Sequence, residues 1–181
     1  WELKVTGMVD KDLRFSYADL LERNLIEEDI TLTCVSNTVG GQLTGTARWL
    51  GIPLSELLDE AGVQSGADQI VGRSVDGYTG GFPLATAYDR PTLVAIGMNG
   101  EPLPIDHGFP ARLMVPGLYG YVSATKWLTE IELTRFADFD QYWVKRGWDQ
   151  EAPIKTMSRI DAPRTLAKIA AGTFVIGGVA W

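Results

Sequence analysis

The spacing of apolar residues near the start of the chain switches between strand-like and helix-like patterns. Residues 2–9 (ELKVTGMV) alternate apolar and polar side chains, which is typical of a half-buried strand. Residues 16–24 (SYADLLERN) have helical spacing, and Ser16 followed by Asp19 predicts a variant capping box. Alternation returns over residues 29–35 (DITLTCV). The pattern therefore predicts a strand, a short helix and a second strand, in that order.

Cys34 lies near the end of this second predicted strand and is the only cysteine in the chain. Alternation places Ile30, Leu32 and Cys34 on the apolar face of the strand, with the threonines between them on the other face. A Gly-Gly turn follows at residues 40–41. Cys34 is thus predicted to be the last residue of the apolar face.

The most regular helical pattern covers residues 53–63 (PLSELLDEAGV). Its apolar positions recur at helical spacing, at Leu54, Leu57, Leu58 and Ala61. Pro53 suits the start of a helix, and Gly62 suits a left-handed C-cap. We therefore predict an amphipathic helix between these two residues.

Strand-like runs separated by Gly- and Pro-rich loops dominate the rest of the chain. These runs cover residues 68–75, 92–98, 111–117 and 126–136. Helices are short, strands are numerous, and the two do not alternate regularly. This organisation predicts an α+β fold of mixed β-sheets, short helices and long irregular loops rather than a wound parallel sheet.

Composition narrows the class of protein and its partners. The chain has 181 residues, of which 45% are hydrophobic and 22% charged, as expected for one main globular domain. Its formal net charge of -7 argues against a nucleic-acid partner, because phosphate attraction needs a basic surface. Any anion site must therefore be a local cluster of cations. No apolar run near either end approaches the roughly 20 residues that span a bilayer.

Few residues could carry chemistry, and several interpretations of them stay open. His107 is the only histidine, so a zinc site of histidine or cysteine–histidine ligands cannot be built from this chain alone. Cys34 and His107 could form the nucleophilic pair of a hydrolase. Alternatively, Cys34 could be a small buried hydrophobe and His107 a turn residue.

A third interpretation combines the Cys34 thiol with the cationic side chains found later in the chain. A cysteine at the end of a strand could present a soft ligand to a metal that is carried by a cofactor. Residues 106–127 (DHGFPARLMVPGLYGYVSATKW) add His107, Arg112 and Lys126, which could donate charge-assisted hydrogen bonds to a phosphate. This combination indicates a phosphorylated metal cofactor.

The order of several short motifs resembles the molybdopterin-binding domain of the sulfite oxidase family, which also includes bacterial methionine sulfoxide reductase catalytic subunits. The resemblance covers about residues 31–133. Its motifs are, in order, Cys34, RWLGIPL, NGEPLP, DHGFPAR, VPG and KWL. A motif of this kind is a hypothesis that its structural context must confirm.

The resemblance implies roles for seven residues. The Cys34 thiolate would ligate molybdenum directly, as the catalytic and metal-binding residue. The residues that would hold the pterin and its phosphate, partly through main-chain groups, are His107, Arg112, Ala124, Thr125 and Lys126. Asp76 would contact the pterin ring; its alternative is a turn aspartate before Gly77.

Departures from the family pattern bear on the substrate. Sulfite oxidases carry arginines soon after the cysteine, where this chain has Thr38 and Val39. Trp148 takes the place of their active-site tyrosine. Tyr142 and Arg146 could compensate, or they could be a packed aromatic and a solvated charge. A sulfite-binding site in this chain would therefore lack the positive charges that those arginines supply in sulfite oxidases.

The resemblance implies a molybdenum-dependent oxidoreductase that catalyses two-electron oxygen-atom transfer on a small substrate, which could contain sulfur. With one histidine the chain cannot supply a pair of axial histidines for haem, so electrons would be exchanged with a separate haem or membrane partner. An extracytoplasmic location, periplasmic or membrane-associated, is implied as well. The alternative is a non-catalytic binding or scaffold module that retains the molybdopterin-binding fold.

The resemblance also implies a division of the chain. Residues 1–155 would form the molybdopterin-binding oxidoreductase domain. Residues 156–181 resemble the start of an immunoglobulin-like second domain, truncated about one strand into it.

Overall fold

Two five-stranded sheets and one two-stranded sheet make up the strands of the computed structural model, which describes residues 1–38 and 40–180. The first sheet has the order β2-β1-β10-β5-β6 and contains β1 (Leu3–Gly7), β2 (Leu13–Phe15), β5 (Gln69–Ser74), β6 (Thr79–Pro83) and β10 (Leu128–Thr134). The second has the order β3-β4-β7-β8, with β9 paired to β7, and contains β3 (Ile26–Thr33), β4 (Thr44–Pro53), β7 (Leu93–Met98), β8 (Glu101–Pro102) and β9 (Arg112–Met114). The third pairs β11 (Ser158–Ala162) with β12 (Gly177–Ala180).

The helices are short and lie between the strands in sequence. They are α1 (Tyr17–Leu21), α2 (Leu54–Ala61), α3 (Thr86–Asp89), α4 (Gly120–Ser123) and the 3-10 turns η1 (Ile105–His107) and η2 (Val144–Arg146). None of the described helices is both long enough and apolar enough to cross a membrane. Mixed sheets with short helices and long connections confirm the predicted α+β class.

Local signals placed the two predicted helices correctly. The Ser16 hydroxyl accepts from the Asp19 N–H at 3.2 Å, and the Asp19 carboxylate accepts from the Ser16 N–H at 2.7 Å. These bonds form the predicted capping box and lower the pKa of Asp19. Helix α2 ends at Gly62, whose φ of 71° is the left-handed conformation expected there.

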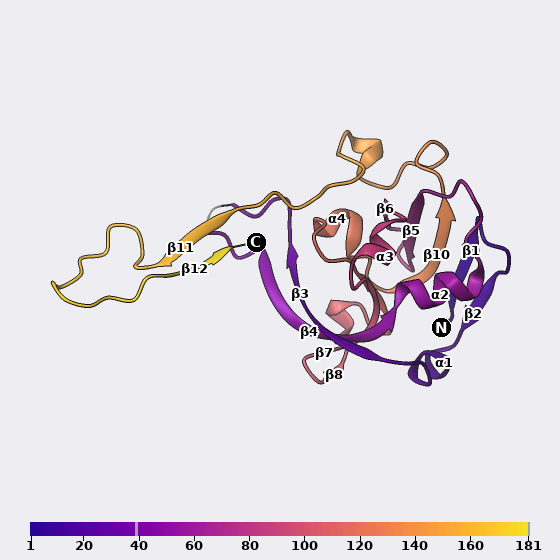
Figure 1. Ribbon diagram of the computed structural model, residues 1–181, viewed down its shortest axis with the longest axis horizontal. Coiled ribbons are helices and arrows are strands. Elements are labelled where there is room, and N and C mark those ends of the chain that lie inside the picture. The colour runs from indigo at the N-terminus through magenta and orange to yellow at the C-terminus, as the bar shows by residue number, and fades with distance from the viewer. Residues whose placement is uncertain (39, 181) are drawn as a thin grey trace.

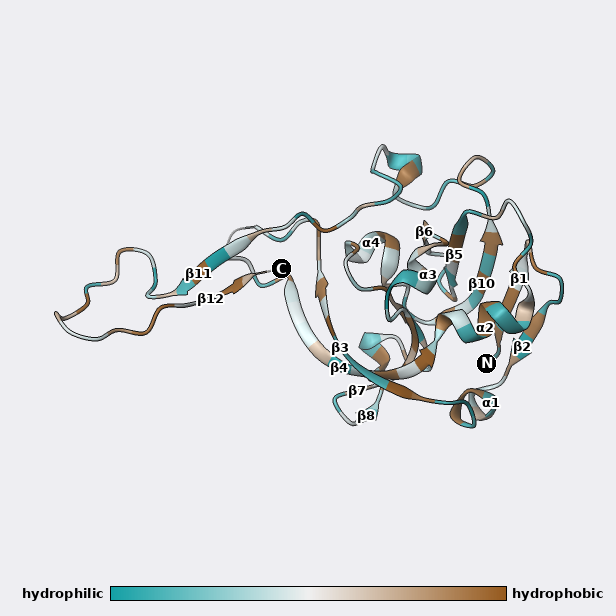
Figure 2. Cartoon of the chain, viewed as in Figure 1, coloured by the Kyte–Doolittle hydropathy of each residue, from teal (hydrophilic) through white to brown (hydrophobic). Residues whose placement is uncertain are grey.

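The main core lies under the first sheet and α2. Strands β1 and β10 pair in parallel, with Val5 opposite Ile131, and both side chains are fully buried. The predicted apolar face of α2 packs into the same core. A smaller cluster includes Ile30, Trp49 and Met114 of the second sheet. Figure 2 shows hydrophobic residues, in brown, on β10 and on the curved ribbon of β3 and β4.

The β3–β4 hairpin is the longest in the molecule, pairing Ile26 with Gly51 at one end and Thr33 with Thr44 at the other. Its loop begins at Cys34, whose N–H donates to the Leu43 carbonyl at 2.9 Å. The hydrophobic pattern of residues 44–53 did not predict strand β4, because the glycine and proline residues in this segment are typical of loops. The hairpin therefore carries Cys34 to the tip of the second sheet.

The segment after β10 is anchored by a buried amide. Gln141 is fully buried, and its Oε1 accepts from the Gly81 N–H at 2.8 Å while its Nε2 donates to the Gly81 carbonyl at 2.9 Å. These two bonds pair the side chain with the backbone of edge strand β6. They hold the aromatic segment, residues 142–148, against the body.

Replacing Gln141 with leucine is expected to lower the free energy of unfolding by about 2–4 kcal/mol, because both polar groups of Gly81 lose their partner inside the protein. Equilibrium unfolding in urea measures this loss. Gln64→Leu is the matched control: it removes one partly exposed bond, to the Val9 carbonyl, and should cost about 1 kcal/mol. Equal losses in the two variants would contradict this account of Gln141.

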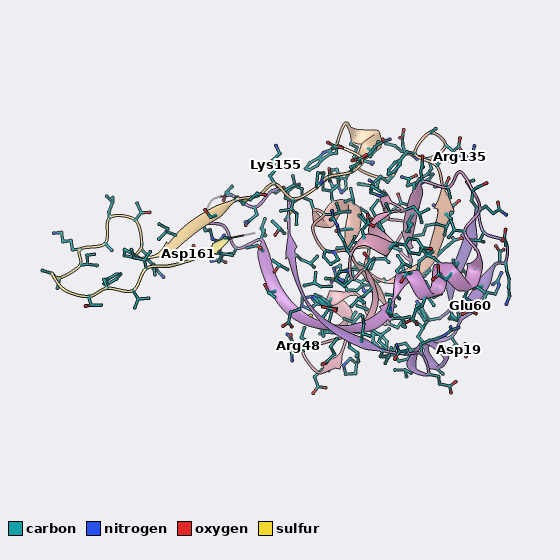
Figure 3. The ribbon with its side chains drawn as sticks, viewed as in Figure 1. Asp19, Arg48, Glu60, Arg135, Lys155 and Asp161 are labelled. Carbon is teal, nitrogen blue, oxygen red and sulfur yellow. The ribbon has the colours of Figure 1, made fainter. Side chains whose placement is uncertain are left out.

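Strands β11 and β12 form an arm that extends from the rest of the molecule (Figure 1). Figure 3 labels Lys155 where the chain leaves the body and Asp161 on the arm. Arg159 of β11 donates to the Gly41 carbonyl at 3.0 Å, which ties the arm to the loop that begins at Cys34. The division of the chain at residue 155 into a main domain and the start of an immunoglobulin-like domain remains a prediction.

Candidate cofactor site

A cavity of about 470 Å³, here called the thiol cavity, opens beside Cys34. Its wall includes the Cys34 thiol, the His107 ring, Trp49 and Tyr121. Cys34 comes from the end of β3, Trp49 from β4 and His107 from η1, so segments far apart in the sequence meet here. The structure thus brings Cys34 and His107 to the wall of one cavity, and the cofactor-binding roles of both residues remain predictions.

A second cavity, of about 290 Å³ and here called the lysine cavity, adjoins the first. Asp76, Ala124, Lys126 and Trp127 contribute to its wall. Gly120, the first residue of α4, lines both cavities. A cofactor that reached Cys34 from Lys126 would therefore pass Gly120.

Cys34 is exposed, which corrects the prediction that it ends the apolar face of its strand. Strand β3 ends one residue earlier, at Thr33, and Thr33 is the buried residue, 2% exposed. The hydroxyls of Thr33 and Thr44 lie 3.1 Å apart and share a hydrogen bond, which satisfies the buried polar group. The interpretation of Cys34 as a small buried hydrophobe is therefore wrong.

Arg112 lies behind the two cavities, and its hydrogen bonds connect a wall residue of one cavity to a wall residue of the other. Its side chain donates from Nη1 to the His107 carbonyl at 2.9 Å and from Nη2 to the Ala124 carbonyl at 3.4 Å. Arg112 is only 4% exposed, and burial lowers its pKa to about 10. Its buried Nε has no partner in the described part of the chain. A buried cationic donor without an acceptor is costly, and an anion would satisfy it.

Lys126 and Asp76 lie on the wall of the lysine cavity. Lys126 donates from Nζ to the Asp106 carbonyl at 2.8 Å. The Asp76 carboxylate accepts from the Tyr78 N–H at 3.0 Å, and this bond, followed by the Ser74 hydroxyl, lowers the pKa of Asp76. Asp76 thus forms the predicted turn before Gly77 and also lines the cavity, so its two interpretations are compatible.

Thr125 differs from its neighbours, because its side chain is 1% exposed. Its hydroxyl donates to the Gly72 carbonyl of β5 at 3.5 Å, and its carbonyl accepts from the Leu113 N–H at 2.9 Å. The Thr125 hydroxyl is therefore engaged with β5, and a role of Thr125 in binding the pterin remains a prediction.

The residues that motif reasoning did not assign are aromatic. Trp49 and Tyr121 line the thiol cavity, and Trp127 lines the lysine cavity. Trp49 and Trp127 are themselves part of the motifs RWLGIPL and KWL. Their place in the motifs was the available signal, but a large aromatic residue is more often part of the packed core.

Of the residues considered in place of the family's tyrosine, Trp148 packs behind the thiol cavity, while Tyr142 packs on Tyr78 of the lysine cavity, with ring centroids 5.5 Å apart. The Trp148 ring packs edge-on against Tyr121, with centroids 5.1 Å apart. The Arg146 guanidinium lies 3.6 Å from the centroid of Tyr142. Of the two residues that replace the family's arginines, Thr38 is exposed and Val39 lies outside the described residues.

Gly108 separates the two cations of the site. A Cβ built on Gly108 would lie 3.0 Å from the Lys126 Cβ and 3.2 Å from the Arg112 Cβ, and φ is 109°. Only glycine fits such a contact at a positive φ without displacing a neighbour. The close approach of η1 to both cations therefore depends on this residue.

Gly108→Ala is expected to cost about 1–3 kcal/mol of unfolding free energy and also to weaken phosphate binding, because the new methyl group would push the cations apart. Gly100→Ala is the control: φ is 83°, but its Cβ would meet no atom within 4 Å. This control variant should lose about 1–2 kcal/mol of unfolding free energy without any change in its affinity for phosphate. Thermal unfolding and phosphate titration measure the two effects. A loss of phosphate affinity in Gly100→Ala would count against this explanation.

Comparisons with known proteins show which proteins the chain is similar to. The uncharacterized oxidoreductase YuiH of Bacillus subtilis is 32% identical over 152 residues, which cover 82% of this chain and 72% of that protein. Rat mitochondrial sulfite oxidase is 32% identical over 165 residues, covering 75% of this chain but 30% of that protein. NADH nitrate reductase of Solanum lycopersicum is 32% identical over 162 residues, covering 74% of this chain and 18% of that protein. The chain therefore spans under a third of the last two relatives.

A solved structure shares the fold. The sulfane dehydrogenase SoxCD from Paracoccus pantotrophus superposes with a TM-score of 0.81 at 24% sequence identity, covering all of this chain and 53% of that chain. This likeness confirms that the mixed sheets and short helices form the expected type of fold.

The donor set of the site fits a phosphorylated metal cofactor. Cys34 and His107 line the thiol cavity and Lys126 lines the lysine cavity, while the buried guanidinium of Arg112, with its unpaired Nε, is bonded to the carbonyls of the wall residues His107 and Ala124. Among the described residues, no cluster of three or more histidine, cysteine, aspartate or glutamate side chains could hold a metal ion. Residues 1–143 match the oxidoreductase molybdopterin binding domain. The chain belongs to this family of molybdopterin-binding oxidoreductase domains, and its cofactor is molybdopterin.

Proposed function

We propose that the chain is the catalytic domain of a molybdenum-dependent oxidoreductase that transfers an oxygen atom, with two electrons, to or from a small substrate. One observation carries the proposal. Exposed Cys34 lines one of two cavities that share Gly120, Lys126 lines the other, and Arg112 lies behind both, bonded to the carbonyls of the wall residues His107 and Ala124. A soft metal ligand and an anion site thus lie where one elongated cofactor could reach both.

Each site residue has a chemical role in this proposal. The Cys34 thiolate ligates the metal, because sulfur suits a metal in high oxidation states. Arg112 and Lys126 bind the phosphate through charge-assisted hydrogen bonds, and His107 adds a donor from η1. Asp76 accepts from the pterin ring, while main-chain groups of residues 124–125 complete the wall. When bound, the cofactor supplies the oxygen-atom and two-electron chemistry.

The substrate and the electron partner belong to the proposal as well. Thr38 leaves the loop after Cys34 without the positive charge that would attract sulfite, so we favour a small neutral substrate, such as one with a sulfur–oxygen bond, over an anion. Electrons would pass to or from a separate haem or membrane partner outside the cytoplasm. The net charge of -7 favours a partner with a basic surface.

Metal and pterin analysis tests the proposal. Chain produced in a host that makes molybdopterin, with molybdate supplied, should contain about one molybdenum and one pterin per chain, because there is one ligating thiol. Loaded chain should then exchange electrons with a redox dye in the presence of small sulfoxides or sulfite. Full loading without turnover on any oxygen-atom donor or acceptor would instead support the scaffold alternative. Chain without molybdenum or pterin would contradict the proposal.

A further inference from the structure

Each of the two cations assigned to the phosphate lies over the face of a tryptophan. The Arg112 guanidinium carbon is 5.0 Å from the centroid of the Trp49 ring. The Lys126 ammonium is 4.2 Å from the centroid of the Trp127 ring. A cation over an indole face is attracted by the negative face of the ring, most strongly where water is excluded. Trp49 is 3% exposed, so its contact with Arg112 is desolvated.

The two indoles are themselves held in place. The Trp49 N–H donates to the Ile30 carbonyl at 3.2 Å, and the Trp127 N–H donates to the Ile105 carbonyl at 2.7 Å. Ile30 belongs to β3, the strand that ends next to Cys34, so Trp49 connects that strand to Arg112. Trp127 has a φ of 48°, a left-handed conformation that costs free energy in a bulky residue.

Three successive carbonyl groups of η1 accept hydrogen bonds from the two cations and from the Trp127 indole. The carbonyls of residues 105, 106 and 107 accept from Trp127, Lys126 and Arg112 in that order. Long cationic side chains lose rotamer freedom when they bind a ligand, and this loss weakens binding. Rings and carbonyls that already hold the cations reduce the loss before any anion arrives.

We propose that Trp49 and Trp127 are positioning residues, which hold the Arg112 guanidinium and the Lys126 ammonium in place for the phosphate of the cofactor. This inference rests on the proposed function and adds to it the aromatic support of the anion site. The negative ring faces attract the cations, while hydrogen bonds from the indole N–H groups fix the rings to β3 and η1.

Matched substitutions isolate the ring face from the N–H group. Trp→Phe and Trp→Leu both remove the N–H donor, but only phenylalanine keeps an aromatic face. Chain from a host that makes no molybdopterin is titrated with inorganic phosphate by calorimetry. We expect Trp49→Leu or Trp127→Leu to lower phosphate affinity about three- to tenfold, the range of one cation–π contact. Trp49→Phe and Trp127→Phe should keep most of the affinity of the parent chain. The pterin content of chain from a molybdopterin-producing host should follow the same order.

A control and a second measurement keep the test decisive. The Trp1 N–H also donates to a carbonyl, that of Leu128, but its ring is under no cation among the described contacts, so Trp1→Leu should leave phosphate affinity unchanged. Where a leucine variant does not fold, fluorinated tryptophan replaces it as the test. Fluorine weakens the negative ring face and keeps the shape, so affinity should fall as fluorine is added.

The outcomes separate this inference from the proposed function. If Arg112→Met and Lys126→Met lower phosphate affinity while the leucine variants or fluorination do not, the positioning role is wrong and the cofactor site stands. If leucine and phenylalanine lower affinity equally, the ring face is not the cause and the inference fails. If neither methionine variant affects phosphate or pterin content, the anion site of the proposed function fails with it.

Discussion

Replacing Cys34 with serine is expected to remove one sulfur from the coordination of molybdenum and to lower turnover at least about 100-fold. Loss of residues that merely support a metal ligand costs 10–100-fold, so loss of a ligand should cost at least as much. Cys34 is the only cysteine in the chain, so no other protein thiol can replace it. X-ray absorption at the molybdenum edge counts the sulfur neighbours, and dye-coupled turnover gives the rate.

Ser36→Ala is the control for this prediction, because Ser36 is an exposed residue of the same loop. It should leave the sulfur count and the rate unchanged. The Cys34 assignment would be wrong if the serine variant kept every molybdenum–sulfur distance of the parent. A lower rate with an unchanged sulfur count would place Cys34 beside the metal rather than on it.

The second large effect is expected at Arg112. Arg112→Met should weaken phosphate binding about 10- to 100-fold and lower the pterin content, because one buried charge-assisted donor is lost. The free energy of unfolding should change by less than about 2 kcal/mol, because methionine removes the cost of burying an unpaired cationic donor while the His107 and Ala124 carbonyls lose their partner, and these two effects oppose each other. Calorimetric titration and urea unfolding measure the two quantities separately.

The lowered pKa explains why stability and binding should separate at this residue. Burial lowers the pKa of Arg112 to about 10, well below its ordinary value, so between the folded and the unfolded pKa the unfolded chain binds more protons than the folded chain. Stability should therefore rise with pH in that window, and at neutral pH the full cost of burying the charge is present. A bound phosphate offsets this cost, whereas methionine removes it.

Arg90→Met provides the matched control for Arg112. Arg90 also donates to a backbone carbonyl, that of Pro116 at 2.8 Å, but Pro116 lines neither cavity, whereas Arg112 donates to His107 and Ala124, which do. Its replacement should leave phosphate affinity and pterin content unchanged. Equal loss of phosphate affinity in both variants would mean that overall positive charge, and not the position of Arg112, attracts the anion.

Local patterns predicted the elements that local forces stabilise. The capping box of Ser16 and Asp19 and the left-handed Gly62 depend on neighbours within a few residues, so both were predictable. Strand β4 was missed because its pairing with β3 in the hairpin and with β7, which lies far away in the sequence, overrides the loop-like glycine and proline residues. Cys34 was placed in the apolar face because alternation does not indicate where a strand ends.

The sequence by itself determined the family, the α+β class and the residue types that can meet molybdopterin, because motif order and side-chain chemistry are properties of the linear chain. Only the tertiary structure decided that Cys34 and His107 line one cavity, that Arg112 is buried with an unpaired Nε, and that Arg112 and Lys126 lie over tryptophan rings. Burial and cavities arise from contacts between segments distant in sequence. Local spacing carries no information about such contacts.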